Sequence, residues 1–67
     1  MQMMSVDSSA ISAVGYDPVS GRLRIQFTHN GAYCDFCRVP EHIYYGLMSA
    51  PSIGAYYNNH IRDHYQC

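Results

Sequence analysis

The chain has 67 residues, enough for one small domain with a thin hydrophobic core. Its four basic residues, all Arg, and five acidic residues give a net charge of −1, which argues against a dedicated nucleic-acid binder because such proteins usually carry a clear basic excess. No apolar run approaches the ~20 residues that a transmembrane helix needs, so no membrane partner is expected.

The N-terminal part of the chain predicts a short free end and then a strand. Residues 1–7 show neither helical nor strand periodicity, so we expect a flexible N-terminus there and a single domain over residues 8–67. Small and β-branched residues from Ser8 to Tyr16 predict the first strand. Ile11 and Val14 are three apart, which strict alternation places on opposite faces. Either a β-bulge intervenes or Ile11 precedes the strand, and both alternatives stay open.

A turn signal follows, and then a clearly alternating segment. Asp17-Pro18-Val19-Ser20-Gly21 combines the residue types that favour a tight turn. From Arg22 to Thr28, apolar and polar residues alternate, with Leu23, Ile25 and Phe27 on one face. This pattern is typical of an antiparallel strand with one buried and one exposed face.

Asn30-Gly31 predicts a hairpin that leads into the third strand. A two-residue loop at this position also fixes which residues lie opposite each other. The expected pairs are His29 with Ala32, Phe27 with Cys34 and Ile25 with Phe36 on the buried side, and Thr28 with Tyr33, Gln26 with Asp35 and Arg24 with Cys37 on the outer side.

Two helices are expected after the sheet. Pro40 suits the first position of a helix, and Ile43, Leu47 and Ala50 give that helix a buried line. Ser52 is a good N-cap for a second helix.

The second helix carries one continuous apolar stripe. Ile53, Tyr57, Ile61 and Tyr65 recur every fourth residue, and we expect the first three to pack on the Leu23–Ile25–Phe27 side of the sheet. The predicted fold class is therefore α+β: a three-stranded antiparallel meander followed by two helices packed on one face (β-β-β-α-α).

Several short segments, in their order and spacing, resemble the KTSC domain family. The segments are Ser8-Ser9-Ala10-Ile11, Val14-Gly15-Tyr16-Asp17, Val39-Pro40, Ile43-Tyr44, Leu47 and Ala50-Pro51-Ser52-Ile53-Gly54, then Tyr56, Asn58, Ile61-Arg62 and Tyr65. The family is named for the C-terminal segment of some lysyl-tRNA synthetases and also occurs as stand-alone bacterial and phage proteins. The resemblance implies a domain whose function is not established and for which RNA binding has been suggested.

Two departures from the family pattern weaken the RNA hypothesis for this chain. The Tyr-x-Tyr by which the family is usually recognised corresponds to Cys34 and Phe36. Basic residues that often flank the Gly of its Ala-x-Ser-x-Gly segment correspond to Ile53 and Ala55. Both changes remove rings or charges that a nucleic-acid surface uses.

Cysteine and histidine residues offer a metal-site alternative. Cys34 and Cys37 combine with His60 and His64, which are one helical turn apart, as ligand types that zinc prefers. However, 22 residues separate Cys37 from His60, more than in a zinc finger, and the register above points the two thiols to opposite faces. We therefore expect no metal, no cofactor and no enzyme activity. An odd count of three Cys favours free thiols in a reduced, cytoplasmic protein.

Arginine and aromatic residues supply the candidate binding positions. They are Arg22, Arg24 and Tyr33 on the outer sheet face with Arg38 nearby, and Tyr56, Asn58 and Arg62 on the last helix. Rings stack on bases and Arg pairs with phosphates, so either group suits RNA or single-stranded nucleic acid. The structural alternative is a solvated face on which Arg22 or Arg24 pairs with Asp35. The second functional hypothesis is a protein-interaction module, docking on a larger protein or forming a homodimer, with no nucleic-acid role.

Overall fold

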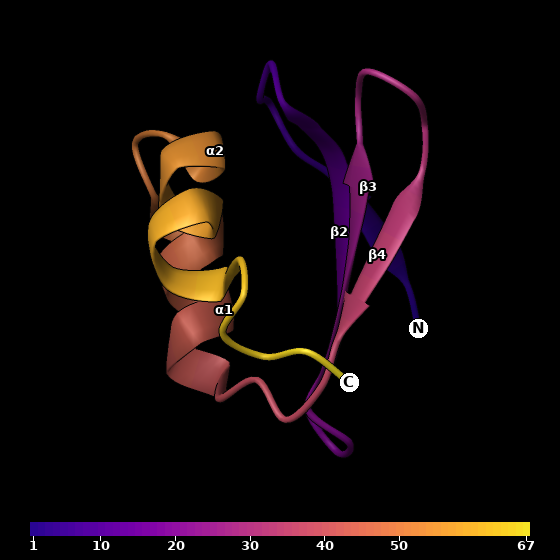
Figure 1. Ribbon diagram of the computed structural model, residues 1–67, viewed down its shortest axis with the longest axis vertical. Helices are drawn as coiled ribbons and strands as arrows, with labels where there is room; N and C mark the ends of the chain where they lie inside the picture. Colours follow the sequence, from indigo (N-terminus) through magenta and orange to yellow (C-terminus); the bar gives the residue numbers. More distant parts are fainter.

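A sheet of four antiparallel strands carries all the helices on one face (Figure 1). The computed structural model describes residues 1–67. Its strands are β1 (Met3–Ser5), β2 (Ile11–Asp17), β3 (Arg22–Phe27) and β4 (Tyr33–Phe36), in that order across the sheet. The second layer holds α1 (Glu41–Ser49), α2 (Ile53–Tyr56) and the π-helical η1 (Tyr57–Ile61). None of these helical segments has the length and apolar character needed to cross a bilayer.

The expected count of three strands is wrong, because the N-terminal segment adds a fourth. Met3 lies opposite Gly15 and Ser5 opposite Ala13, so β1 extends the sheet beyond β2. Gly15 makes this possible: a Cβ there would lie only 2.6 Å from the Met3 sulfur. The strand depends on pairing with β2 rather than on its own alternation, which is why local periodicity did not reveal it.

A β-bulge settles the open question about β2. Ile11 pairs with Phe27 and Ala13 with Gln26, so Ser12 is an extra residue on this strand. The bulge turns Ile11 and Val14 to the same face, and both side chains are fully buried. Of the two alternatives left by the sequence, the bulge is the one that occurs.

The predicted hairpin register is wrong by two residues. Ile25 lies opposite Cys34 and Leu23 opposite Phe36, while Arg24 faces Asp35 on the other side of the sheet. A two-residue type I′ loop needs positive φ at both central residues, but of Asn30 and Gly31 only Gly31 has it, at 68°. The loop is longer, and because the shift is even each side chain keeps its predicted face.

The core lies between the sheet and the helical layer. Its buried residues are Ile11, Val14, Leu23, Ile25, Phe36, Val39, Leu47 and Ile61, with Ile53, Phe27 and Tyr57 partly buried against them. The prediction that Ile53, Tyr57 and Ile61 face the sheet is therefore confirmed. Pro40 is the residue that caps α1 rather than its first helical residue.

The last helix is shorter than predicted and changes type. Ser52 caps it as expected, its hydroxyl accepting from the Ala55 amide at 3.3 Å. After Tyr56 the backbone forms a π-helical turn, in which the Arg62 amide donates to the Tyr57 carbonyl at 2.9 Å. The helix ends at Ile61, so Tyr65 lies beyond it, although Tyr65 still packs against the core.

The C-terminal tail returns to the edge of the sheet and is fixed there. Asp63 has a positive φ of 64° and reverses the chain. The Cys37 amide then donates to the Tyr65 carbonyl at 2.8 Å, and a disulfide joins Cys37 to Cys67. The expectation of three free thiols is therefore wrong, because parity of the cysteine count does not show which two the fold brings together. Cys34 alone is free.

Candidate functional site

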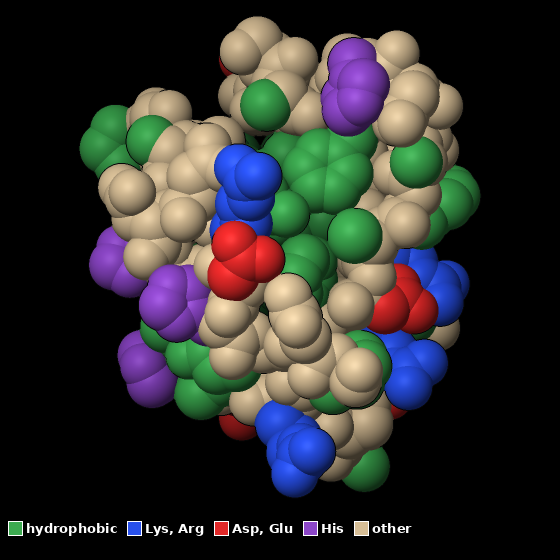
Figure 2. Space-filling model, viewed as in Figure 1, with side chains coloured by type: hydrophobic (Ala, Val, Ile, Leu, Met, Phe, Trp, Pro, Cys, Tyr) green, Lys and Arg blue, Asp and Glu red, His purple; other side chains and the backbone are tan.

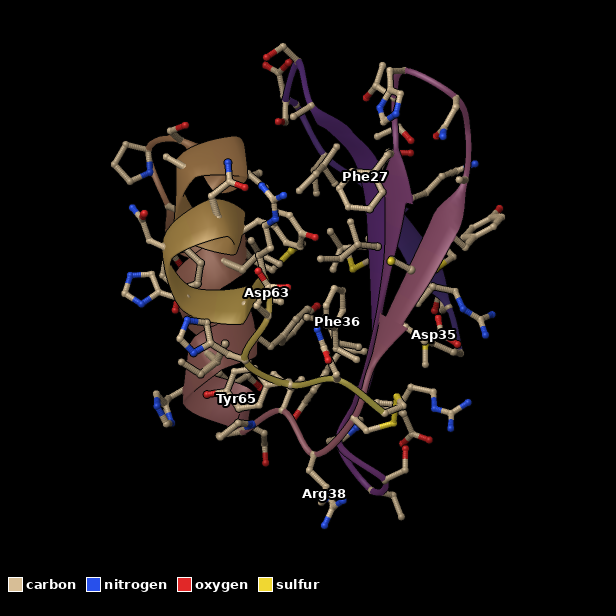
Figure 3. The ribbon with its side chains drawn as sticks, in the orientation of Figure 1. Phe27, Asp35, Phe36, Arg38, Asp63 and Tyr65 are labelled. Carbon is tan, nitrogen blue, oxygen red and sulfur yellow. A yellow bond between two sulfur atoms is a disulfide. The ribbon has the colours of Figure 1, made fainter.

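The predicted residues of the outer sheet face, Arg22, Arg24 and Tyr33, lie close together, and the two arginines contact the carboxylate of Asp35. Arg24 donates from Nε and Nη2 to the two carboxylate oxygens of Asp35, at 2.8 and 3.0 Å. These bonds hold the pKa of Asp35 below its ordinary value. Arg22 lies 3.9 Å from the same carboxylate, and the Arg24 guanidinium is 6.0 Å from the Tyr33 ring centre. In Figure 3 Asp35 points away from the helical layer. The alternative considered from the sequence, in which Arg22 or Arg24 pairs with Asp35, is therefore the one that the structure shows.

Two other predicted residues lie apart from any common site. Arg38 occupies the loop before α1, at the end of the molecule away from Phe27 (Figure 3). Tyr56 packs on α1, where a Cβ on Gly46 would overlap its hydroxyl, and its ring lies 4.4 Å from that of His60. Tyr56 therefore does not join Asn58 and Arg62 in one surface.

A cleft opens where the helical layer and the sheet separate. Its volume is about 380 Å³. One wall comes from α2, η1 and the residue after η1, and the other from the segment before β2 and the end of β3 with the turn after it. The lining residues are Ser9, Ala10, Phe27, His29, Gly54, Tyr57, Asn58 and Arg62. Figure 2 shows hydrophobic side chains reaching the surface between the two layers, with charged side chains along one border and a His near one end.

Two aromatic rings form the apolar part of the cleft. Phe27 points from the sheet toward the helices (Figure 3) and meets Tyr57 edge-on, with ring centres 5.3 Å apart. Tyr57 also packs edge-on against Phe36 at 5.9 Å, which joins the cleft to the core. Burial, and secondarily the neighbouring Cys34, raise the pKa of the Tyr57 phenol. The hydroxyl is therefore protonated at neutral pH, and it has no hydrogen-bond partner within the protein.

The rim of the cleft carries one positive charge. Arg62 and Asn58 lie one turn apart, as predicted, and Arg62 Nη1 donates to Asn58 Oδ1 at a long 3.5 Å. Arg62 Nε is 4.0 Å from an Asp63 oxygen, and the Arg62 side chain is 63% exposed. Asp63 is not among the lining residues, so Arg62 is the only charged group that lines the cleft.

The residues of the zinc alternative do not form a common site. The Cys37 sulfur is bonded to Cys67 and is not available as a thiolate ligand. Cys34 lies on β4, while His60 contacts the Tyr56 ring at a tilt and His64 follows the end of η1. No three His, Cys, Asp or Glu side chains lie where they would hold one metal ion.

Sequence reasoning found part of the cleft and missed the rest. Asn58 and Arg62 were predicted site residues, whereas Phe27 and Tyr57 were predicted only as core. Ser9, Ala10 and Gly54 had entered only as parts of the family pattern, and His29 only in the hairpin register. The available signal was the apolar stripe itself, since its first turns lie where the two layers part and the core reaches solvent.

Two of the comparisons with known proteins name one and the same family. A family model described as KTSC domain matches residues 7–65. A protein from Tsukamurella paurometabola is 34% identical over 64 residues, covering 96% of this chain and 94% of the relative. An uncharacterised protein from Stutzerimonas stutzeri is 30% identical, covering 98% and 93%. The crystal structure of a KTSC domain protein from Yersinia pestis matches with a TM-score of 0.93 and 36% identity, over 98% of this chain and 92% of that one.

Proposed function

The chain belongs to the KTSC domain family, and we propose that it is a non-enzymatic protein-interaction module that binds a partner through the cleft. The observation that carries this proposal is the pair of half-buried rings, Phe27 and Tyr57, that line an opening with one charged group. A partner side chain placed there replaces water on apolar surface, which is the main source of binding free energy at protein contacts.

The size of the cleft supports an anchored contact. At about 380 Å³ it lies at the lower end of the range of roughly 300–1,000 Å³ that ligand pockets span. That volume suits one large apolar side chain with the backbone that carries it. The surrounding Asn58 and Arg62 supply the polar rim that fixes orientation at such sites.

The distribution of arginines makes nucleic acid the less favoured partner. Two of the four Arg side chains, Arg22 and Arg24, have an oxygen of the Asp35 carboxylate within 3.9 Å, and the other two, Arg38 and Arg62, lie on separate parts of the molecule. A groove that follows a phosphate backbone needs several cations free to replace counterions. On the outer face, the single carboxylate of Asp35 compensates one of the two positive charges of Arg22 and Arg24.

A titration followed by amide NMR shifts tests the proposal. The probes are the peptide Ac-Ala-Ala-Ala-Phe, as free acid and as amide, and an eight-residue oligo(U) at low salt. We expect at least one peptide form to shift amides of the cleft residues, and oligo(U) to shift none. Binding of oligo(U) that weakens steeply with salt would favour the nucleic-acid function instead.

An occluding variant distinguishes the cleft from other surfaces. Ala10 is exposed and lines the opening, so Ala10→Leu fills it without disturbing the core. Ala32→Leu adds the same carbons at an exposed position outside the cleft. Loss of peptide binding in Ala10→Leu alone supports the cleft, and equal behaviour of the two variants contradicts it.

A further inference from the structure

We infer that the cleft recognises the C-terminal residue of a partner polypeptide, with an apolar side chain against Phe27 and Tyr57 and the terminal carboxylate on Arg62. This inference rests on the proposed protein-interaction function and specifies its ligand. It follows from charge, from free hydrogen-bond donors and from the geometry of extended peptides.

The charge of the cleft favours an anionic ligand group. Of its eight lining residues, Arg62 alone carries a full charge, and none is Asp or Glu. An incoming carboxylate therefore meets one cation in the lining, and the nearest acid, Asp63, stands outside the lining with an oxygen 4.0 Å from Arg62 Nε. The outer sheet face differs, because there a carboxylate, Asp35, already occupies the space between Arg22 and Arg24.

Arg62 keeps more of its donors available than Arg24 does. Arg24 directs two nitrogens at both oxygens of Asp35. Arg62 makes one long bond to Asn58, and its 4.0 Å contact with Asp63 is too long for a hydrogen bond. A guanidinium with free nitrogens matches the two oxygens of a carboxylate in a parallel pair of bonds.

The Tyr57 hydroxyl is a neutral hydrogen-bond donor next to the two rings, Phe27 and Tyr57, that line the cleft. Its hydroxyl makes no hydrogen bond within the protein, and no buried side-chain oxygen of the chain is left without a partner. The Tyr57 oxygen is therefore reachable from solvent. Since burial raises the pKa of this phenol, it stays protonated and can donate to an anion.

The pairing of an apolar group with a carboxylate points to a chain end. In an extended peptide, successive side chains point to opposite faces. An internal apolar residue and an Asp or Glu directly after it therefore point apart, and an acidic residue two positions on shares the face but lies about 6.6 Å further along the chain. A C-terminal residue carries its side chain and its carboxylate on the same Cα, so both enter together.

Three matched peptides separate these alternatives: Ac-Ala-Ala-Ala-Phe as free acid, the same peptide as amide, and Ac-Ala-Phe-Ala-Asp-amide, whose only charge is a side-chain carboxylate on the same face as the Phe ring. Dissociation constants are measured from cleft amide shifts. We expect the free acid to bind about tenfold more tightly than the other two, the difference typical of a charge-assisted hydrogen-bonded contact.

Two Arg variants test the assignment to Arg62. In Arg62→Gln, the preference for acid over amide should disappear while weak binding of the amide remains. Arg38→Gln removes an exposed Arg away from the cleft and should keep the full preference. The spectrum of each free variant shows that it is folded, so a changed preference reports recognition rather than stability.

The outcomes distinguish this inference from the proposed function. Equal affinity for acid and amide at the cleft would overturn carboxylate recognition and leave the interaction module standing. Equal affinity for the terminal and side-chain carboxylates would overturn the chain-end assignment. No shift of cleft residues by any of the three peptides would overturn both.

Discussion

The outer sheet face and the cleft contain similar residues in different surroundings. Each pairs an Arg with an aromatic ring: Arg24 with Tyr33 on the outer face, and Arg62 with Tyr57 in the cleft. On the outer face Asp35 takes two hydrogen bonds from Arg24. In the cleft Arg62 makes one long bond to a neutral amide. Binding capacity therefore depends less on which residues are present than on which partners they already have.

The aromatic rings of the two regions, Tyr33 and Tyr57, also differ in their surroundings. Tyr33 is 59% exposed and stands on the edge strand β4, with Arg24 near its ring. Tyr57 lies half-buried between Phe27 and Phe36, so a ligand that touches it also touches Phe27. A concave apolar surface removes more water per contact than an isolated ring. The predictions below test this contrast, from the largest expected effect to the smallest.

Breaking the disulfide should destabilise the helical segments that form one wall of the cleft. The residues of the outer face lie on β3 and β4 and should be affected less. The bond closes a separation of 30 residues that includes α1, α2 and η1. Cys67→Ser should lower the free energy of unfolding by about 3–4 kcal/mol, the chain-entropy value for a loop of this length. Urea unfolding measures the loss.

The matched control for this variant is Cys34→Ser, which changes the one free thiol. It should unfold at the same urea concentration as the parent protein, apart from a small shift. A reductant should destabilise the parent and leave Cys67→Ser unchanged. Equal unfolding of the parent with and without reductant would contradict a disulfide between Cys37 and Cys67.

Adding a side chain at Gly46 tests the assignment of Tyr56 to packing rather than to the cleft. A Cβ there would overlap the Tyr56 hydroxyl. Gly46→Ala should therefore destabilise the fold by about 1–2 kcal/mol, because the overlap outweighs the gain in helix propensity. Thermal unfolding checks this, and adding Tyr56→Phe should recover part of the loss. No recovery in the double variant would show that the hydroxyl is not the obstacle.

Removing the Asp35 charge tests the ion pair that distinguishes the outer sheet face from the cleft. Asp35→Asn should cost about 0.5–1 kcal/mol near neutral pH, as expected for a partly exposed bidentate pair. Arg24 bonding lowers the pKa of Asp35 from its ordinary 3.8 in the folded state. The stabilisation is thus present above that value and is lost as pH falls through the folded pKa.

Urea unfolding of parent and Asp35→Asn over a range of pH measures this difference. The two proteins should converge in strongly acidic solution. Arg22→Gln is the control, since its 3.9 Å contact should contribute less than the Arg24 bonds. A gap between parent and Asp35→Asn that widens on acidification would contradict the assignment.

Sequence reasoning located the faces of the elements but not their long-range partners. The alternation of Leu23, Ile25 and Phe27 and the Ser52 cap describe local physics, and both predictions hold. The β1 strand depends on pairing with β2, where Met3 lies opposite Gly15. The disulfide depends on the C-terminal tail returning to Cys37. Neither feature has a local signature that a short window detects.

The same limit explains the candidate site. The i, i+4 spacing placed Asn58 and Arg62 together, but the cleft opposite them is built from Ala10, Phe27 and His29, which are distant in sequence. The hairpin register failed because it depended on whether Asn30 takes a positive φ, which its residue type permits but does not require. Spacing predicts which side chains share an element, and tertiary structure decides which of them meet.

The most direct test of the contrast compares the two arginines in one binding measurement. The dissociation constant of Ac-Ala-Ala-Ala-Phe free acid is determined for Arg62→Gln and for Arg24→Gln. We predict that Arg62→Gln binds about tenfold more weakly than the parent protein and that Arg24→Gln binds as tightly as the parent. Unchanged binding in Arg62→Gln together with lost binding in Arg24→Gln would place the site on the outer sheet face and contradict the account.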